Sequence, residues 1–271
     1  MTLEELRELV FTACESTKLS SVHIIPELDK VPGPTDSKFG GDYCLPAGTG
    51  LSELEFMAQI NFAQVPHLEG FPESSLLQFF LRTDAAAKRD FRYEGRNAWL
   101  MDSGLFQIRW VPELSETSSA GKAAVPQDRW FTRSLTGGMR FQLAEEVASF
   151  SVGNDGLCTD MGYEEAAELL PEDDLEDTEY DTGTEEGGDR FFTEFGNQGC
   201  KLGGHPAIGW GDPREVDDNY PLWKAYTALL FQLDLIPDQE YGPDVFGFFM
   251  KPEDLAAHRF ENVLMTYLNI Y

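Results

Sequence analysis

The sequence predicts an α+β protein that is rich in antiparallel strands, begins with a helix and contains two pseudo-symmetric, internally duplicated halves. Three observations carry this prediction: a capped amphipathic segment at the start, strand-like runs separated by turns, and short motifs that recur in the same order. With 271 residues, 42% of them hydrophobic, the chain can bury a sizeable core. We expect a single domain over 1–271, with a helix at 1–18 and halves at about 36–135 and 136–271.

The predicted helix lies in the opening stretch, TLEELRELVFTACEST. Thr2 and Glu5 have the spacing of a capping box, in which each side chain bonds the backbone N–H of the other residue. Leu3, Leu6 and Val10 recur at helical intervals, which indicates an amphipathic helix packed on the body. The passage that follows, PELDKVPGPTDSKFGGDYCLPAGTG, is rich in Pro and Gly, so we expect it to be irregular.

Strand-like runs occupy most of the remaining chain. LEFMAQINFA and GLFQIRWVPE alternate between apolar and other residues, whereas SSLLQFFL is apolar on both faces, as in a central strand. MRFQLAEEVASFSV is strand-like at either end, and YEEAAELL has a short helical pattern. ALLFQLDL and VFGFFM predict further strands, and PEDLAAHRFENVLMTYLNIY predicts a helical turn and a last strand. Strands joined by polar turns favour an antiparallel sheet over βαβ units.

Three short motifs occur twice in the same order. KFGG at 38–41 recurs as KLGG at 201–204, AQIN at 58–61 as FQLD at 231–234, and FFL at 79–81 as FFM at 248–250. The ordered set favours an internal duplication. Neither glycine pair fits a nucleotide-binding fingerprint, so a tight turn is the preferred interpretation, and a small anion held near Lys38 or Lys201 is the alternative.

Several segments together resemble a known family, the YwqG-like bacterial proteins of unknown function. They are SKFGGDYCLP, LEFMAQINFAQVP followed by LLQFF, GGHPAIGWGDPR, LLFQLDL, FGFFMKPEDL and HRFENV, and they span about 36–271. The resemblance implies an α+β fold with duplicated halves, but no agreed activity, cofactor or catalytic residue, and some members are associated with toxin–immunity gene sets. The chain departs from the family pattern at Cys200, His205 and Trp210, and any function that depends on the usual residues there is in doubt.

The charge of the chain is strongly negative, with 48 acidic against 20 basic residues and a net charge of −28. Residues 145–189 contain 17 Asp or Glu and no Lys or Arg. Such a field repels nucleic-acid phosphates and anionic membranes, and it favours encounter with basic partners. We therefore expect no nucleic-acid or membrane partner. The alternative is that an acidic loop at 171–189 serves solubility alone.

Compartment and cofactors are inferred from motifs that do not occur. No apolar run reaches the roughly 18–20 residues that span a bilayer, and no signal-peptide pattern stands at the N-terminus. The four cysteines form no CxxC pair, and the four histidines show no metal-ligand spacing. These patterns predict a cytoplasmic protein with reduced thiols and with neither a metal nor a cofactor.

Two groups of polar residues are candidates for a binding site. Two pairs of polar residues, at 59 and 61 and at 232 and 234, each share a strand face, and in pseudo-symmetric halves they would face each other across a cleft. The alternative is that they line a solvated face or satisfy backbone groups at a sheet edge. The stretch 205–214 brings a histidine near an aspartate, as in general acid–base catalysis, but a structural turn is preferred. The candidate ligand- or partner-binding residues are Gln59, Asn61, His205, Trp210, Asp212, Arg214, Gln232 and Asp234.

These observations favour a noncatalytic, acidic binding protein that recognises a basic protein partner, as an immunity or inhibitor protein does. The alternative function is small-molecule or peptide binding, with or without hydrolysis, in a cleft between the halves. A third hypothesis is a scaffold that binds nothing specific. No catalytic residue is assigned, and the oligomeric state stays open.

Overall fold

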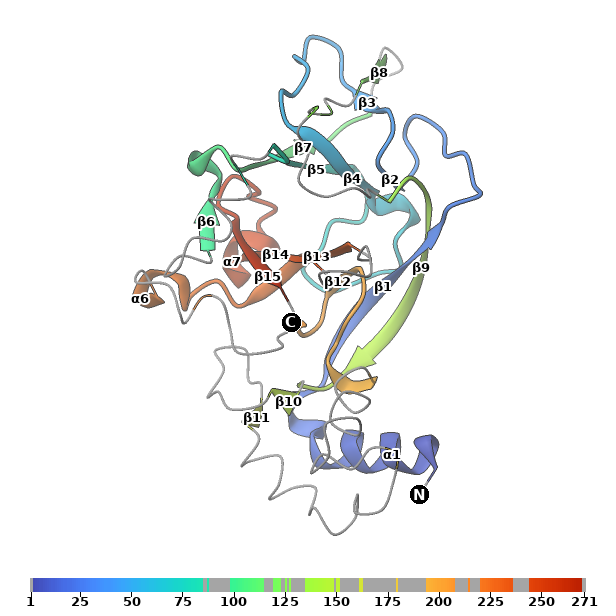
Figure 1. The fold of residues 1–271 in the computed structure, drawn as a ribbon, viewed down its shortest axis with the longest axis vertical. Coiled ribbons are helices and arrows are strands. Elements are labelled where there is room, and N and C mark those ends of the chain that lie inside the picture. Colours follow the sequence, from blue (N-terminus) through green and yellow to red (C-terminus); the bar gives the residue numbers. More distant parts are fainter. Residues whose placement is uncertain are drawn as a thin grey trace.

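In the part of the chain that the structure describes, eleven strands form one sheet, which curls into a half-barrel (Figure 1). The computed structural model describes residues 2–84, 87, 98–114, 119–122, 125, 127, 135–148, 150–151, 161–162, 179, 194–207, 214, 220–235 and 244–269. In sheet order the strands are β6 (Ala98–Leu100), β15 (Leu264–Asn269), β14 (Asp244–Met250), β13 (Ala228–Leu235), β12 (Lys201–Gly203), β1 (Leu19–Glu27), β9 (Gly137–Glu146), β2 (Lys38–Phe39), β4 (Glu55–Asn61), β5 (Leu76–Leu81) and β7 (Phe106–Val111). Neighbouring strands of this sheet run antiparallel, which confirms the predicted strand-rich antiparallel fold.

Short elements complete the described part of the chain. β3 (Tyr43–Leu45) pairs with β8 (Ser119–Gly121), and β10 (Phe150–Ser151) pairs with β11 (Met161–Gly162). The other helices are α6 (Tyr220–Trp223), α7 (Pro252–Ala256) and the 3₁₀ turns η1 (Glu15–Thr17), η2 (Phe62–Gln64) and η3 (Met101–Ser103). The passage expected to be irregular therefore contains β2 and β3, because strands of two or three residues are too short to show an alternating pattern.

The predicted N-terminal helix is confirmed as α1 (Leu3–Ala13), at one end of the molecule (Figure 1). Its capping box is complete: the Glu5 backbone N–H donates to Thr2 Oγ1 over 3.2 Å, and the Thr2 backbone N–H donates to Glu5 Oε2 over 2.6 Å. Leu6 and Val10 are buried in a small cluster with Cys14, Val147 and Phe195, separate from the main core. Among the described residues, no helix has the length and apolar character needed to cross a membrane.

The long strands β1 and β9 form a central ribbon, paired from Leu19–Glu146 to Glu27–Gly138 (Figure 1). On its outer edges β1 pairs with the short strand β12, and β9 pairs with the short strand β2. The sequence did not predict β1. From this strand, Val22 and Ile24 alone belong to the main core. The polar residues near its start and the internal Pro26 obscure the strand pattern in the sequence.

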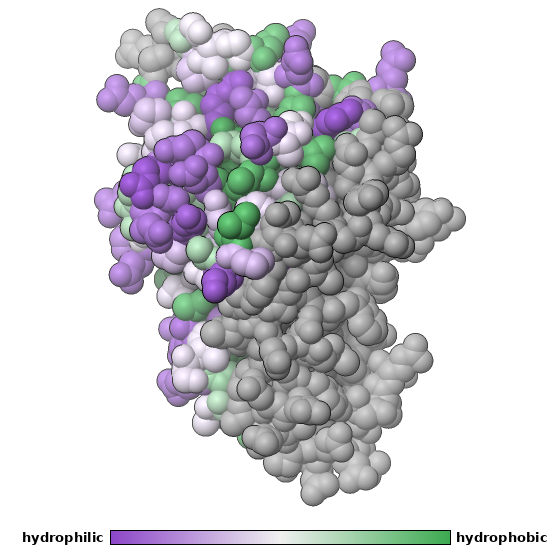
Figure 2. All heavy atoms as spheres, turned by 90° about the vertical axis from the view of Figure 1, so that its left-hand side faces the viewer, coloured by the Kyte–Doolittle hydropathy of each residue, from purple (hydrophilic) through white to green (hydrophobic). Residues whose placement is uncertain are grey.

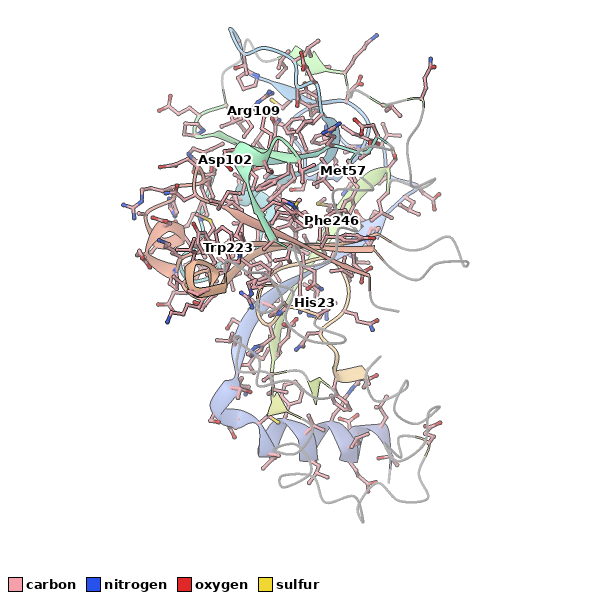
Figure 3. The ribbon with its side chains drawn as sticks, turned by 60° about the vertical axis from the view of Figure 1, so that its left-hand side comes forward. His23, Met57, Asp102, Arg109, Trp223 and Phe246 are labelled. Carbon is pink, nitrogen blue, oxygen red and sulfur yellow. The ribbon has the colours of Figure 1, made fainter. Side chains whose placement is uncertain are left out.

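Two groups of strands extend from the central ribbon, and we call them wings. The first wing comprises β2, β4, β5 and β7, and the second comprises β12, β13, β14 and β15. Their inner faces share one core, in which the Phe79 ring centre lies 4.5 Å from that of Phe231 and 5.0 Å from that of Phe248. Met57 of the first wing and Phe246 of the second both belong to this core (Figure 3). The wings are thus held together mainly by burial of apolar side chains.

Candidate functional site

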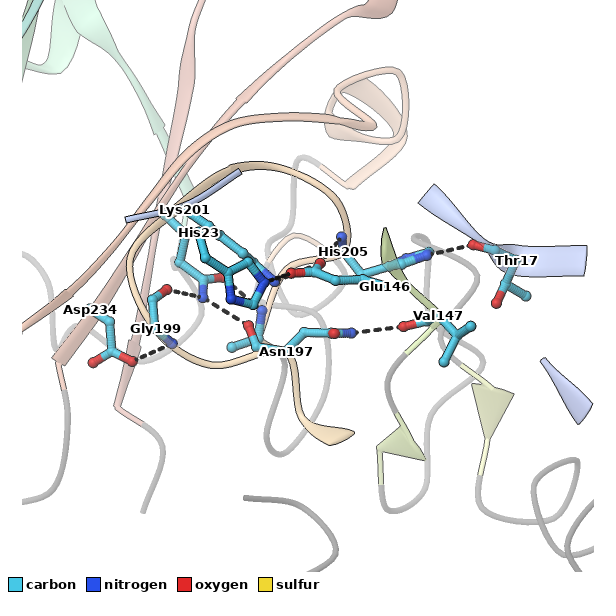
Figure 4. Close-up of polar contacts among 11 residues, drawn as sticks. Thr17, His23, Glu146, Val147, Asn197, Gly199, Lys201, His205 and Asp234 are labelled. Atoms are coloured by element: carbon cyan, nitrogen blue, oxygen red, sulfur yellow. Dashed lines mark hydrogen bonds and ion pairs between the residues drawn. The ribbon is translucent and has the colours of Figure 1, made fainter. Parts of the chain in front are cut away.

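A buried ionic cluster joins the central ribbon to the second wing (Figure 4). Glu146, at the end of β9, accepts hydrogen bonds from three groups. His23 Nε2 donates to Oε1 over 2.7 Å, whereas Lys201 Nζ and the His205 backbone N–H each donate to Oε2 over 2.9 Å. The side chain of Glu146 is 5% exposed and that of Lys201 is fully buried. Strand register creates the cluster, because His23 and Lys201 are paired residues of β1 and β12.

The electrostatics of the cluster keep Glu146 ionised. Burial acts to raise the pKa of Glu146, but the charge of Lys201 and the hydrogen bonds from His23, Lys201 and His205 outweigh it and lower that pKa to about 2. At neutral pH this carboxylate carries no proton to donate, and both of its oxygens accept hydrogen bonds. It can orient His23 and neutralise Lys201, but it is poorly suited to act as a general acid.

His205, a predicted candidate for acid–base chemistry, serves as a structural tie. It is 1% exposed, and its Nε2 donates to the Thr17 carbonyl over 2.7 Å. The Thr17 hydroxyl in turn accepts from the Ala148 backbone N–H over 2.9 Å. His205 therefore links the loop after β12 to the segment between α1 and β1.

His23 is the member of the cluster that reaches solvent, with 42% of its side chain exposed. Together with Glu146 it forms a carboxylate–histidine pair, an arrangement that fixes the orientation of an imidazole. No local sequence pattern points to His23, because its partner Glu146 lies 123 positions away. The β1–β9 ladder pairs His23 with Gln142 and Glu146 with Leu19, so the two side chains meet diagonally across the strands.

Gln232 and Asp234 bind the loop around β12. Gln232 Oε1 accepts from the Ala207 backbone N–H over 2.7 Å, and its Nε2 donates to the carbonyls of Asn197 (3.0 Å) and Gly199 (2.8 Å). Asp234 Oδ2 accepts from the Gly199 backbone N–H over 2.9 Å. The structure thus brings three predicted residues, His205, Gln232 and Asp234, to one loop, where they satisfy backbone groups.

Gln59 and Asn61 bind a separate loop in the first wing. Gln59 is fully buried; its Oε1 accepts from the Cys44 backbone N–H over 2.9 Å, and its Nε2 donates to the carbonyls of Pro34 (3.1 Å) and Asp36 (2.9 Å). Asn61 Nδ2 donates to the Thr35 carbonyl over 2.9 Å. The amide donors of Gln59 are fully used inside the chain.

The two polar pairs do not face each other across the halves. Ala58 and Ile60 of β4, and Phe231 and Leu233 of β13, point into the shared core. The side chains that alternate with them therefore point outward. The expectation of a cleft lined by these pairs is corrected: apolar side chains fill the space between the wings, since inward-facing positions are the ones that hydrophobic burial selects.

The remaining predicted residues lie elsewhere or are not described. Arg214 is fully buried, where its Nη1 donates to the Tyr226 carbonyl over 2.6 Å and its guanidinium carbon lies 4.1 Å from the Phe249 ring centre. Trp210 and Asp212 lie outside the described residues, as does the acidic loop predicted at 171–189 except for residue 179.

The two Lys-apolar-Gly-Gly motifs form equivalent turns with different partners for the lysine. Both glycine pairs have positive φ, 53° and 67° in the first motif and 64° and 70° in the second, which glycine adopts readily. Lys38 Nζ donates to the carbonyls of Gly33, Pro34 (3.1 Å) and Asp42 (3.3 Å). Burial lowers the pKa of Lys38, while the charges of Asp36 and Asp42 act to raise it. Among the described residues, no carboxylate forms an ion pair with Lys38 as Glu146 does with Lys201.

Thiols and carboxylates do not gather into a metal site among the described residues. Cys14, Cys44 and Cys200 are buried thiols. Burial raises the pKa of Cys14 to about 11 and that of Cys200 to about 12, so both stay protonated at neutral pH. Their environment suits packing rather than nucleophilic chemistry.

The fold and the cluster define an antiparallel half-barrel held by internal ionic and amide ties, and comparison with known proteins assigns it to a family. Residues 37–268 match the family described as "domain of unknown function (DUF1963)", and the chain belongs to that family. No curated protein matches the chain. The matched region begins after α1 and β1, so the strand at the centre of the sheet precedes it.

Proposed function

We propose that this DUF1963 member is a noncatalytic, acidic binding protein that recognises a basic protein partner, in the manner of an immunity or inhibitor protein. The observation that carries the proposal is the net charge of −28, with 17 acidic residues and no basic residue over 145–189. An acidic field of this size accelerates encounter with a cationic partner.

Exposed carboxylates on the described surface support the proposal. On α1 and η1, Glu4, Glu5, Glu8 and Glu15 are exposed, against one exposed arginine, Arg7, which is ion-paired with Glu194. Hydrophilic side chains also cover much of the described part of the face in Figure 2. A polar, negatively charged surface of this kind selects partners by charge.

The engagement of the interior polar groups supports a noncatalytic role. Glu146 and Lys201 neutralise each other, and the donors of Gln59 and Gln232 are used by loop carbonyls. Groups held this way stabilise the fold, since a buried polar group without a partner is costly.

We also propose that the chain is YwqG-like, with two halves related by an internal duplication. The hydrogen-bond partners of the two glutamines support this proposal. Gln59 bonds the backbone at 34, 36 and 44, and Gln232 bonds it at 197, 199 and 207, so each partner is displaced by the same 163 positions. Each glutamine is also paired in register with the lysine of its own motif, Lys38 or Lys201.

Backbone irregularities agree with the proposed duplication. The ladder of β4 shifts register between Phe56 and Ala58, and that of β13 shifts between Leu229 and Phe231. In both strands the irregularity ends one residue before the glutamine that occurs in both motifs, Gln59 or Gln232. A bulge at equivalent positions is the kind of feature that copies of one ancestral unit retain.

The proposed duplication also places the acidic segment in one of two equivalent strand connections. Because β1 pairs with β12 and β9 pairs with β2, β1 and β9 occupy equivalent places in the two halves. The connection from β1 to β2 covers only 28–37, whereas the one from β9 to β12 covers 147–200 and holds most of the acidic run. This difference supports the interpretation that the acidic segment was added to a repeated framework and carries recognition.

Affinity capture and charge neutralisation test the proposed function. The full chain is used to capture partners from native lysate at low and high salt, and an identified partner is then titrated by calorimetry. The test variant converts the seven acidic residues of 172–181 to amides; a control converts the exposed Glu53, Glu69 and Glu73. We expect at least a tenfold loss of affinity in the test variant and in high salt, with little change in the control. Association that is unaffected by salt and by the test variant contradicts the proposal.

A further inference from the structure

A row of three polar side chains crosses the outer face of the first wing. Gln59 of β4 is paired in register with Gln78 of β5, and Gln78 is paired with Arg109 of β7. Apolar clusters flank the row, one formed by Tyr43, Phe56 and Phe80 and the other by Cys44, Leu76 and Val111. We call these three residues the polar row. Because β7 is the last of the described strands on this side of the sheet, the row ends at an edge of the described sheet.

Two atoms of the polar row have no hydrogen-bond partner among the residues that the structure describes. Gln78 is fully buried; its Nε2 donates to the Cys44 carbonyl (2.6 Å) and to Gln59 Oε1 (2.9 Å), whereas its Oε1 accepts nothing. Arg109 Nη2 donates to the Gly50 carbonyl over 3.1 Å, whereas its Nη1 is buried and donates to nothing. An unsatisfied buried donor and an unsatisfied buried acceptor on paired residues destabilise the fold, because both lose the hydrogen bonds that water gives them in the unfolded chain.

Arg109 also has no counter-charge among the described residues. Its guanidinium carbon lies 5.1 Å from the Phe80 ring centre and 5.7 Å from that of Tyr43, so aromatic rings rather than carboxylates surround it. Other arginines of this acidic chain are ion-paired: Arg7 with Glu194, Arg82 with Asp84, and Arg259 with Asp254. A partly buried cation of this kind is stabilised by an anion that enters its surroundings.

The second wing closes the corresponding place by packing. There the row consists of Gln232, Gly247 and Thr266, again paired in register. The Thr266 hydroxyl donates to the Gly247 carbonyl over 3.4 Å. A Cβ at Gly247 would lie 2.6 Å from Phe249 Cε2, so the position is filled. The fold therefore does not require a glutamine and an arginine at these positions.

We propose that Gln78 and Arg109 bind a small carboxylate that carries a hydroxyl or ammonium group on the adjacent carbon. Arg109 Nη1 donates to a carboxylate oxygen, and Gln78 Oε1 accepts from the neighbouring donor, which satisfies both open atoms at once. The ligand enters from the edge at β7, where the Gly50 loop that contacts the guanidinium shifts to admit it. This site lies at the end of the molecule opposite α1 and goes beyond the proposed partner binding (Figure 3).

Three small probes test the chemistry of the site in the full chain: glycolate, acetate and glycolamide. Calorimetry should give glycolate a dissociation constant of about 1 mM, the range open to so small a ligand. Acetate, which lacks the donor, should bind at least about tenfold more weakly, because Gln78 Oε1 is left unpaired. Glycolamide, which lacks the charge, should not bind measurably.

Variants separate the two contacts. Arg109→Met should abolish glycolate binding, and Arg109→Lys should weaken it at least about tenfold, since an ammonium does not reproduce the guanidinium geometry. Gln78→Met should remove the preference for glycolate over acetate. Arg140→Met, at an arginine of β9 with 56% of its side chain exposed, is the control and should bind as the parent does.

Stability and structure complete the test. Arg109→Met should unfold in urea at the same or a higher concentration than the parent, because it removes an unpaired buried donor. Glycolate binding that survives Arg109→Met overturns the proposal. So does a crystal structure grown with glycolate in which one water bridges Gln78 Oε1 and Arg109 Nη1 and no glycolate is bound.

Discussion

The two wings bury equivalent lysines and stabilise them in different ways. In the first wing Lys38 donates to three backbone carbonyls of the loop that surrounds it, at residues 33, 34 and 42. In the second wing Lys201 forms an ion pair with Glu146, which belongs to the central ribbon. Both arrangements replace the water that a buried ammonium loses.

The difference lies in what each lysine connects. Lys38 closes a local loop, so its bonds join residues within a few positions of one another. Through Glu146, Lys201 is connected with His23 and His205, and His205 bonds the carbonyl of Thr17. The second arrangement therefore couples the wing, the central ribbon and the segment after α1. Disruption of this cluster should cost more than disruption of its counterpart.

The largest effect is expected for Glu146→Gln. This change leaves the ammonium of Lys201 buried without a counter-charge, which typically costs about 3–5 kcal/mol. Urea unfolding at pH 7 measures the loss of stability. Glu145→Gln is the matched control, because the neighbouring side chain is 62% exposed and its removal should change stability by less than about 1 kcal/mol.

A comparison with Lys38→Met sharpens the result. That variant removes a charge bonded only to carbonyls and leaves no buried ion behind, so it should destabilise less than Glu146→Gln. Equal losses from the two variants would contradict the view that the second wing depends on the ion pair more than the first depends on its loop.

The dependence of stability on acidic pH tests the same cluster, because folding lowers the pKa of Glu146 from 4.5 to about 2. A lowered pKa means that the folded state favours the carboxylate, so this stabilisation is complete above about pH 4.5 and is lost as the pH falls toward 2. The loss should amount to about 3 kcal/mol. Urea unfolding of the parent and of Glu146→Gln should give stabilities that converge across this window; a constant gap would contradict the assignment.

The sequence predicted the parts of the fold that local patterns determine. The capping box, the N-terminal helix and the strands β4, β5, β7, β13 and β14 all follow from periodicity and propensity. The order of the repeated motifs also predicted that Gln59 and Gln232 occupy matching positions. Their role was not predicted, because their partners are backbone groups of loops whose course a sequence pattern does not reveal.

The ionic cluster could not be predicted for a different reason. Glu146 is 123 positions from His23 and 55 from Lys201, and no spacing rule relates them. Their proximity depends on the register of β1 against β9 and β12, and β1 itself lacks a clear strand pattern. The polar row was missed similarly, since Gln78 and Arg109 become neighbours only by pairing of β5 with β7.

Alanine at the second glycine of each motif separates backbone strain from crowding. Gly41 and Gly204 have φ of 67° and 70°, so alanine should cost both a similar amount, about 1–2 kcal/mol. At Gly41 the nearest atom to a new Cβ is 3.9 Å away, whereas at Gly204 a new Cβ would overlap Glu146 Oε2. Gly204→Ala should therefore cost about 1–3 kcal/mol more in urea unfolding. Equal losses of stability in the two variants would show that Glu146 moves away from the new Cβ without destabilising the fold.

The smallest effect is expected for Asp234→Asn, which gives the second wing the residue type that the first wing has at Asn61. Burial raises the pKa of Asp234 above 3.8, so the folded state disfavours its charge, and the stability it contributes in acid is lost as the pH rises through that pKa. Asparagine keeps an acceptor for the Gly199 backbone N–H without the buried charge. Urea unfolding should show a small gain in stability at pH 7 that vanishes below about pH 4.

The reciprocal variant, Asn61→Asp, tests whether the two wings respond alike. It removes the amide that donates to the Thr35 carbonyl and adds a charge at a buried site, so it should lower stability at pH 7 by about 1–3 kcal/mol. Opposite signs for the two exchanges would show that both wings favour the neutral amide at this position. A loss in both would instead mean that Lys201, which acts to lower the pKa of Asp234, makes the carboxylate favourable in the second wing alone.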